Sequence, residues 1–421
     1  MAGKRRGEGK LAGAAPEGLA TALIHHPYVA PAGFDAIAPG VFKASTVLFE
    51  NVAALRAHSW LEKASYSYGL HGTPTSFTLE ARLATLEGGT HALLAPSGLA
   101  AVALVNQALL SSGDALVLPT NVYAPNRNHA VNDLARWGIA HRFYDPMDPA
   151  SLEAALGPDT ALVWMEAAGS VTLEFPDLRA LVRLVRARAP QAVIAMDNTW
   201  GAGIAYDAFD LGPGPGEEGG PALGADLTIH ALTKYPSGAG DMLMGSVVTR
   251  SKVLYERLAL AHSRSGIGVG ANDVEFVLRA LPTIALRYAA QDAAARRIAA
   301  WATGRAEIAR VLHPPTPGSP GHAHWASHCR AAAGLLTLEF DARYTGAQVD
   351  AFVDALRRFG IGWSWGGPMS LAVPYRPEAL RGPGSAYRGG LVRLCIGLED
   401  VGDLIADLEQ ALAVFGVSSP T

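Results

Sequence analysis

The chain has few of the features that mark secreted, membrane or nucleic-acid-binding proteins. Its 421 residues include two cysteines, Cys329 and Cys395, which are too few for a disulfide framework. The formal net charge is −4, so no general attraction to nucleic acid or to an anionic membrane follows. The N-terminus lacks an apolar signal segment, and no uncharged apolar run reaches the roughly 18 residues of a membrane span. We therefore expect a cytoplasmic protein with no nucleic-acid or membrane partner.

What the chain does have is an alternation of short apolar runs and helical stretches. Hydrophobic residues make up 49% of it, and its length is enough for one large α/β domain and a smaller partner. Apolar residues at helical spacing predict helices at 75–87 and 178–189. Five apolar runs are typical of buried strands, at 91–96, 115–119, 161–166, 192–197 and 227–231. Such runs, separated by room for crossover helices, predict a mostly parallel sheet covered on both faces.

The same pattern divides the chain into an arm and two domains. We expect an N-terminal arm at 1–75, whose first part is disordered, a cofactor-binding domain at 76–272 and an α+β C-terminal domain at 273–421. The Gly/Pro-rich stretch 212–221 predicts a flexible surface insertion. The C-terminal domain has helix signals at 273–302, 347–359 and 401–415 and a strand signal at 391–396. The first of these helices is expected to link the two domains.

Two polar side chains lie at predicted strand ends and fit the chemistry of pyridoxal phosphate (PLP). Lys234 follows the run LTIHA and precedes a Gly-rich loop, where a lysine with a lowered pKa can attack an aldehyde. Asp197 ends the run at 192–197 and can pair with a protonated pyridine nitrogen. Taken singly, a solvated lysine and a capping aspartate are the commoner interpretations.

Two further signals fall after other predicted strands. Ser97, Gly98 and Leu99 follow one strand and open a helical run, which is a pattern that can bind a phosphate through main-chain amides. Tyr123 follows the next strand and can stack on a cofactor ring. An ordinary turn and a packing tyrosine are the simpler alternatives for each. All four signals share one location, the carboxyl ends of strands, where open α/β sheets bind ligands.

Segments spread over most of the chain resemble the Cys/Met-metabolism PLP-dependent enzymes, the cystathionine γ-synthase family. The similarity extends from about Thr46 to Phe415. The segments that carry it are YGLHGTPT (68–75), LEGG (86–89), PSGLAA (96–101), MDNTWGAG (196–203), ALTKY (231–235), WSWGG (363–367) and VRLCIGLED (392–400). The resemblance implies the PLP-dependent transferase fold, called fold type I, with PLP as cofactor and a homotetramer built as a dimer of dimers with shared active sites.

The resemblance also implies which residues bind the cofactor. Lys234 would bind its aldehyde covalently and later move protons, and Asp197 would hold the pyridine nitrogen. Tyr123 would stack on the ring and assist proton transfer. The phosphate would be held by a set of groups from two subunits: Gly98, Leu99 and Thr233, with Tyr68 reaching in from the neighbouring subunit.

Substrate binding and reaction type follow from the same resemblance. Arg393 would clamp the α-carboxylate of a sulfur amino acid, and Ser364 would orient Lys234 or the substrate. The tryptophans Trp200 and Trp365 resemble those of the family members that break the Cβ–S bond, so we expect β-elimination. Because Tyr123 or the substrate amine must lose a proton, an alkaline optimum is expected. The alternatives are a γ-lyase, a γ-synthase, a cysteine desulfhydrase and, more remotely, a PLP-binding regulatory protein without turnover.

One position departs from the family pattern. The family usually has an arginine two residues after the tyrosine equivalent to Tyr68, and this chain has Leu70. The missing contact to the phosphate is a charge-assisted hydrogen bond, normally worth about 1.5–3 kcal/mol. We hypothesise that His71, which would also lie near the substrate, or Arg127 supplies the positive charge. If His71→Ala and Arg127→Ala both leave PLP affinity unchanged, this hypothesis is wrong.

Overall fold

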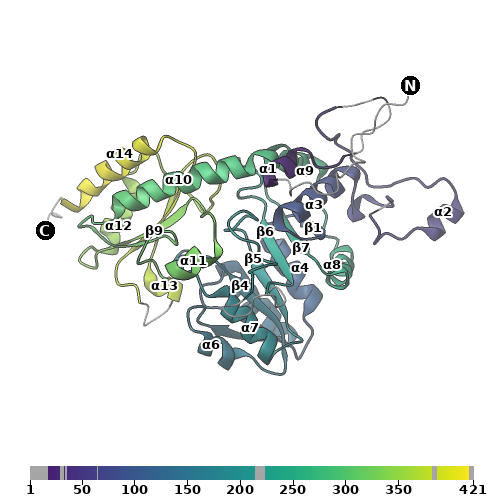
Figure 1. Cartoon of the computed structure of the whole chain (residues 1–421), viewed down its shortest axis with the longest axis horizontal. Coiled ribbons are helices and arrows are strands. Elements are labelled where there is room, and N and C mark those ends of the chain that lie inside the picture. Colours follow the sequence, from purple (N-terminus) through teal and green to yellow (C-terminus); the bar gives the residue numbers. More distant parts are fainter. Residues whose placement is uncertain are drawn as a thin grey trace.

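The computed structural model describes residues 18–28, 33, 36–63, 65–213, 223–381 and 386–416. The predicted disordered tail, and residues 214–221 of the predicted insertion, lie outside these ranges. The described chain forms two lobes, and the long helix α10 (Ile284–Ala302) runs along both of them (Figure 1). No helix in the described ranges is long and apolar enough to cross a membrane.

The larger lobe is built on a seven-stranded sheet with the order β1-β7-β6-β5-β4-β2-β3. Its strands are β1 (His91–Ala95), β2 (Ala115–Pro119), β3 (Ala140–Tyr144), β4 (Thr160–Glu166), β5 (Val193–Asp197), β6 (Leu227–Ala231) and β7 (Gly245–Thr249). The pairs β2–β3, β2–β4, β4–β5 and β5–β6 are parallel, and β7 is antiparallel to both β1 and β6. The predicted mostly parallel sheet and all five predicted strands are thus confirmed. The sequence reading missed β3, whose AHRFY is largely polar, and β7, a short run that begins with glycine.

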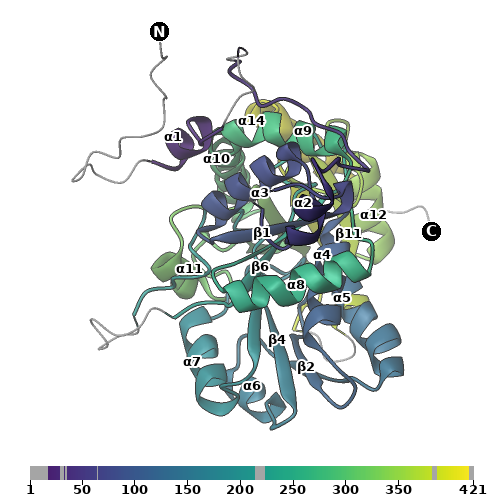
Figure 2. The ribbon, with the colours of Figure 1, turned by 90° about the vertical axis from the view of Figure 1, so that its right-hand side faces the viewer.

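The sheet is buried on both faces, which explains why its strands are nearly continuous apolar runs. Along β1, Leu93 and Ala95 belong to one core, while Ala92 and Leu94 belong to another. The first core includes side chains of α4 (Gly98–Leu109) and α8 (Lys252–Arg264), and Figure 2 shows α8 running across the strands. The second includes those of α3 (Pro74–Glu87), α7 (Leu178–Arg188) and α9 (Ala271–Ala280). The doubly covered sheet leaves its strand ends as the place where polar groups can reach a ligand.

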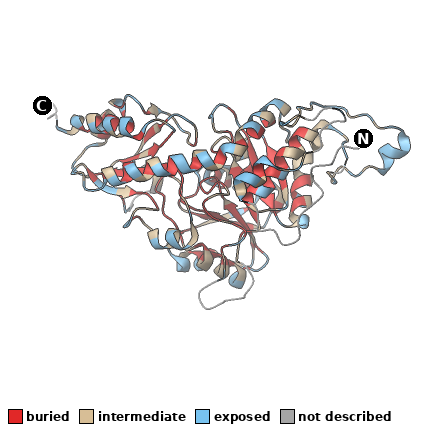
Figure 3. Cartoon of the chain, turned by 45° about the horizontal axis from the view of Figure 1, so that its top comes forward, coloured by how far each residue is buried: buried red, intermediate tan, exposed pale blue. Residues whose placement is uncertain are grey.

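The smaller lobe is a five-stranded sheet with the order β10-β11-β12-β9-β8. Its strands are β8 (Ile308–Leu312), β9 (Leu335–Phe340), β10 (Gly360–Ile361), β11 (Leu371–Tyr375) and β12 (Leu391–Cys395). Val392 and Leu394 of β12 pack in a core with α10, α12 (Gly346–Asp354) and α14 (Val401–Leu412). Figure 3 shows the buried sides of the helices turned toward the sheets. Because side chains alternate along a strand, Arg393 points to the opposite face of this sheet.

Three helix predictions in the C-terminal part of the chain were wrong in their extent. The stretch 273–302 is not one helix: α9 ends at Ala280, a 3-10 turn follows at Leu281–Thr283, and α10 begins at Ile284. Pro282 lies in this turn, and a proline in a helix interior removes a hydrogen bond and clashes with the preceding turn. The predicted helices at 347–359 and 401–415 also end early, as α12 and α14.

Two helices are described in the N-terminal arm. Helix α1 (Leu19–Ile24) buries Leu23, whereas α2 (Val52–Ala57) has no buried residue and projects away from the body (Figure 1). The remaining described helices are short: α5 (Ala124–Asn128), α6 (Pro149–Ala155), α11 (His322–His328) and α13 (Pro377–Arg381), with helical turns at Gly69–His71, His129–Leu134, Ala135–Trp137 and Ala413–Gly416. The strands of the two sheets fall on either side of residue 272, and the domain boundaries themselves stay a prediction.

Candidate active site

A cavity of about 1480 Å³ lies where the carboxyl ends of the large sheet meet the small lobe. It brings together most of the residues predicted from the sequence: Gly98, Leu99, Tyr123, Asp197, Trp200, Thr233, Lys234, Ser364, Trp365 and Arg393. Arg127 also lines it. Tyr68 and His71 do not line this cavity and are described below. One cavity thus collects side chains that follow β1, β2, β5 and β6 and others from the small lobe.

Lys234 is held at the junction of the two lobes. It follows β6, and its Nζ donates a hydrogen bond of 3.0 Å to Ser364 Oγ and lies 5.4 Å from the centre of the Trp365 ring. Burial, and next the positive charge of Arg393, lower the pKa of Lys234 to about 8. The neutral amine, which a nucleophile toward an aldehyde requires, is therefore far more abundant near neutral pH than in an ordinary lysine.

The loop that carries Ser364 can approach Lys234 because of a glycine. Gly366 has a φ of +78°, and a Cβ there would lie 2.9 Å from the main-chain nitrogen of Tyr235. Only glycine adopts this conformation readily and leaves room for so close an approach. Gly366 in WSWGG therefore allows the small lobe to position Ser364 and Trp365 against Lys234.

Asp197 ends β5 beside the end of β6. Its Oδ1 accepts a hydrogen bond of 3.0 Å from the Thr199 amide, and Thr199 Oγ1 in turn accepts one of 3.0 Å from the Ala231 amide. Burial raises the pKa of Asp197, and the bonds from Thr199 oppose that rise. A buried carboxylate facing a cavity is stabilised as an anion by a cationic partner, which is what a pyridinium nitrogen provides.

The start of α4 forms the other end of the cavity. Ser97 Oγ accepts a hydrogen bond from the Ala100 amide, and the main-chain oxygen of Ser97 accepts one from the Ala101 amide. The amides of Gly98 and Leu99 therefore remain available to bind an anion at the start of this helix. A Cβ on Gly98 would lie 2.6 Å from Ala231 Cβ, so glycine lets α4 begin directly against β6.

Arg393 faces the cavity from β12 of the small lobe. Its guanidinium lies 5.6 Å from the centre of the Tyr375 ring, and its Nε is buried without a hydrogen-bond partner within the described part of the chain. A buried donor without an acceptor is costly unless a ligand satisfies it. A substrate carboxylate is a suitable acceptor, because it can take two parallel hydrogen bonds from a guanidinium.

These groups together fit PLP. The uncapped amides of α4 and the Thr233 hydroxyl suit a phosphate, Asp197 suits the pyridine nitrogen, and the Lys234 amine suits the aldehyde. Three features support this fit: the Lys234 amine with its pKa of about 8, the buried Arg393 Nε without a partner in the described chain, and the glycine at the first position of α4. Which residue performs which step stays a prediction.

The sequence reading missed Glu166 at the end of β4. Its Oε2 accepts a hydrogen bond of 2.7 Å from the Tyr123 amide, and its Cα lies in register with that of Asp197. Glu166 ends the apolar run ALVWME in the same way that Asp197 ends AVIAMD. Glu166 could therefore have been predicted from the sequence on the same grounds as Asp197. Asn121, Tyr375 and Glu378 also line the cavity and carried no sequence signal that distinguished them.

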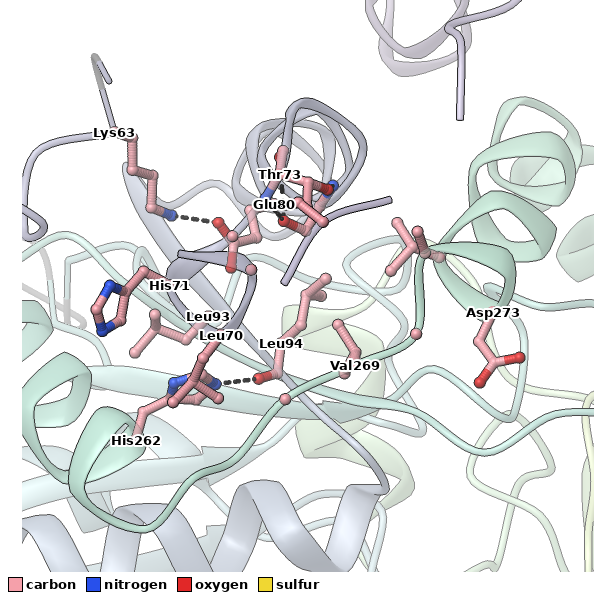
Figure 4. A pocket seen from close by; sticks show the side chains of 18 of the residues that line it. Lys63, Leu70, His71, Thr73, Glu80, Leu93, Leu94, His262, Val269 and Asp273 are labelled. Atoms are coloured by element: carbon pink, nitrogen blue, oxygen red, sulfur yellow. Dashed lines mark hydrogen bonds and ion pairs between the residues drawn. The ribbon is translucent and has the colours of Figure 1, made fainter. Parts of the chain in front are cut away.

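Tyr68, Leu70 and His71 belong to a different part of the chain. Leu70 and His71 line a second cavity of about 400 Å³, which Figure 4 shows together with the ion pair between Lys63 and Glu80. The His71 ring stacks on Trp60 with centroids 4.6 Å apart, and its nitrogens contact Ser67 Oγ and Ser263 Oγ. Tyr68 is 46% exposed.

The two residues hypothesised to replace the missing arginine, His71 and Arg127, line different cavities. Burial, followed by the charge of His58, lowers the pKa of His71, so its ring is mostly neutral. Arg127 is exposed and lines the Lys234 cavity, with its guanidinium 4.5 Å from the centre of the Phe143 ring. Phe143 belongs to β3, which lies four strand spacings, or roughly 19 Å, from β6. Thr233 follows β6, so a direct contact between Arg127 and a phosphate near Thr233 is disfavoured. The hypothesis itself stays a prediction.

The doubly covered sheet and the lysine–aspartate cavity at its strand ends define the class of PLP-dependent enzymes. Residues 20–413 match the family described as Cys/Met metabolism PLP-dependent enzyme, and the chain belongs to that family. It is 37% identical over 380 residues to a putative cystathionine beta-lyase of Rhizobium johnstonii, which covers 90% of this chain and 91% of the relative.

Two further comparisons agree with the family. The chain is 33% identical to cystathionine beta-lyase MetC of Escherichia coli, over 88% of this chain and 92% of that protein. Among solved structures, cystathionine gamma synthase of Xanthomonas oryzae pv. oryzae, in complex with cystathionine, superposes with a TM-score of 0.82 at 29% identity. That match covers 95% of this chain and 99% of the other. The fold class, the family and the PLP cofactor expected from the sequence are confirmed.

Proposed function

We propose that the chain is a PLP-dependent carbon–sulfur lyase that cleaves L-cystathionine by β-elimination into homocysteine, pyruvate and ammonia. The observation that carries the proposal is the convergence of the Lys234 amine, its Ser364 partner and the Arg393 guanidinium in one cavity. The names of relatives at 37% and 33% identity support β-cleavage over the alternatives. The reaction would place the protein in methionine biosynthesis, in the cytoplasm.

Each group of the site has a proposed task in this reaction. PLP, when bound, withdraws electrons from Cα of the substrate. Arg393 binds the α-carboxylate and thereby fixes which substituent of Cα faces Lys234. The neutral amine of Lys234 takes the Cα proton, and the Ser364 hydroxyl holds Nζ in place through their 3.0 Å contact. Breaking the Cβ–S bond leaves a thiolate, which takes a proton from Lys234 or from the Tyr123 hydroxyl and departs as homocysteine. The three-carbon fragment is released as aminoacrylate, which water hydrolyses to pyruvate and ammonia.

The state of Tyr123 follows from its surroundings. Burial, followed by the charges of Asp197 and Glu166, raises the pKa of Tyr123 above its ordinary value. The phenol therefore keeps its proton near neutral pH and suits the role of an acid toward the departing sulfur. The expected alkaline optimum would then depend on the amines, Lys234 and the substrate amine, rather than on a phenolate.

Two tryptophans and a neighbouring subunit also have proposed roles in the site. Trp200 is buried and lines the cavity, and Trp365 contacts both Lys234 and Tyr235. Both would narrow the space for the distal arm of the substrate. We further propose a homotetramer built from dimers in which Tyr68 of one subunit reaches the cofactor phosphate of its neighbour, since the exposed Tyr68 lies outside the cavity of its own chain.

Product analysis tests this function. Purified protein loaded with PLP is incubated with L-cystathionine and, separately, with L-cystine, while pyruvate, 2-oxobutyrate and free thiols are followed. Pyruvate with homocysteine is the expected outcome. 2-Oxobutyrate with cysteine would instead identify a γ-lyase. A cofactor absorbance band without release of any thiol would favour the regulatory alternative.

A further inference from the structure

We propose that Glu166 is a positioning residue for Tyr123: its carboxylate fixes the main chain at the start of α5, and its negative charge keeps the phenol protonated. The first half rests on a direct contact. Tyr123 is the N-cap of α5, and its amide donates a 2.7 Å hydrogen bond to Glu166 Oε2. This bond ties the residue that begins α5 to the end of β4, in the centre of the sheet.

Tyr123 itself has few other restraints, although Asn126 of α5 accepts a 3.4 Å hydrogen bond from Asn106 of α4 and the Val122 amide donates to Pro119 O at the end of β2. Its side chain is 41% exposed toward the cavity, and α5 has only five residues. The main-chain oxygen of Tyr123 accepts from the amides of Asn126 and Arg127, which hold the turn together but do not attach it to the sheet. The bond to Glu166 provides that attachment, and a hydrogen bond to a charged acceptor is roughly twice as strong as one between neutral groups.

The second half rests on the arrangement of charges around the phenol. Glu166 and Asp197 lie in register at the ends of the neighbouring strands β4 and β5, and both line the cavity that Tyr123 faces. Positive groups also face this cavity: Arg127 on α5 itself, Lys234 after β6 and Arg393 on β12. Two more carboxylates, Asp241 and Glu378, line it from other segments. Burial is the largest cause of the raised pKa of Tyr123, and the charges of Asp197 and Glu166 add to it by opposing ionisation of the phenol.

The inference deepens the proposed function, because Tyr123 acts there as a proton donor, but the first part of its test needs neither substrate nor turnover. The protein is labelled with 3-fluorotyrosine, and the ¹⁹F resonance of Tyr123 is assigned by its loss in Tyr123→Phe. The pH titration of this resonance is then compared between the unsubstituted protein and Glu166→Gln, with and without PLP. Glutamine retains an oxygen that accepts from the Tyr123 amide, so the variant removes the charge and keeps the contact.

Two results are expected if the inference holds. In Glu166→Gln the phenol titrates at lower pH than in the unsubstituted protein, and the alkaline limb of the kcat/KM profile moves to lower pH with it. In Glu166→Ala the Tyr123 amide loses its acceptor, and PLP affinity falls by about tenfold, an effect that Glu166→Gln largely avoids. Asp241→Asn is the matched control, because Asp241 is an exposed carboxylate of the same cavity that no described hydrogen bond joins to Tyr123.

The inference is overturned if the Tyr123 resonance titrates alike in the unsubstituted protein and in Glu166→Gln, or if Glu166→Ala binds PLP as tightly as Glu166→Gln. A failure of the proposed function is distinguishable from both outcomes. A protein that does not cleave cystathionine would still show the shifted titration of Tyr123 if Glu166 acts as proposed.

Discussion

The two cavities of the large lobe contain similar kinds of side chain and differ in how those side chains are paired. In the smaller cavity Lys63 Nζ donates to Glu80 Oε2 at 2.6 Å and to Ala92 O at 2.7 Å, and His262 Nε2 contacts Leu94 O at 3.0 Å (Figure 4). In the larger one, Lys234 Nζ contacts a neutral hydroxyl, and Arg393 Nε has no partner in the described chain.

This difference separates a structural lysine from a reactive one. A lysine with a carboxylate partner keeps its proton, because the opposite charge stabilises the ammonium form. Lys234 is buried near a second cation and has a pKa of about 8. A lysine in a cavity is thus a candidate nucleophile when its partners favour the neutral amine. Five predictions test the contrast between the two cavities and the roles that follow from it.

The largest effect is expected for Lys234→Ala. Removing the amine eliminates both the covalent attachment of PLP and the group that moves the Cα proton, so turnover should fall by about 10³-fold or more. Steady-state kinetics and the absorbance spectrum of the holoenzyme measure the two losses. Lys63→Met is the control, since it should retain the spectrum of bound PLP; a spectral loss equal to that of Lys234→Ala would contradict the contrast between the cavities.

Lys63→Met should instead lower stability. Glu80 would be left without its cation, and because the Lys63 side chain is 29% exposed the expected cost in the free energy of unfolding is about 1–3 kcal/mol. Urea denaturation measures the change, and Lys63→Arg should recover most of it. A variant as stable as the unsubstituted protein would show that the ion pair contributes little.

Arg393→Ala should raise KM for L-cystathionine more than it lowers kcat. Losing a charge-assisted contact to the α-carboxylate corresponds to about 1.5–3 kcal/mol, or roughly 10- to 100-fold in kcat/KM. Arg393→Lys should recover only part, because an ammonium does not form the bidentate pair. Equal kcat/KM in the two variants and the unsubstituted protein would remove Arg393 from substrate binding.

Cofactor binding should depend on pH through Lys234. The folded-state pKa of about 8 is lowered from the ordinary value, so the reactive neutral amine becomes the major form above pH 8 and the ammonium below it. The rate at which apoprotein captures PLP should therefore rise as the pH increases to about 8 and level off beyond it. Stopped-flow absorbance measures this rate, and a midpoint near 10 would contradict the burial argument.

The smallest effect is expected for Leu70→Arg, which restores the family pattern. If subunits share their sites as proposed, the new guanidinium should tighten PLP binding by about tenfold. Equilibrium dialysis of the apoprotein measures the affinity, with Leu70→Met as the matched control for side-chain length. A tighter complex with Leu70→Met as well would show that charge is not the cause.

The parts of the fold that could be predicted from the sequence are those with a strong local signal. The strands buried on both faces, such as β2 and β5, are continuous apolar runs and were found. Strand β3 lies at the sheet edge, where its mostly half-buried side chains do not all need to be apolar, and it was missed. The break at Pro282 was overlooked because the apolar spacing continues on both of its sides.

The site was predictable where a residue directly follows a strand, as Lys234 and Asp197 do. Arg393 lies inside a strand of the other lobe and could be named only through the family resemblance. Its approach to Lys234 depends on how the two lobes pack, which no local pattern encodes. The contact between Glu166 and the Tyr123 amide likewise joins residues 43 positions apart, through pairing of strands in the sheet.

The most direct test of the account is reduction of the PLP-loaded protein with borohydride, followed by peptide mapping. The account predicts that a pyridoxyl group is attached to the Nζ of Lys234 and that the peptide containing Lys63 remains unmodified. A protein that stays colourless with PLP, or a label found on another lysine while Lys234 is unmodified, would contradict the central claim.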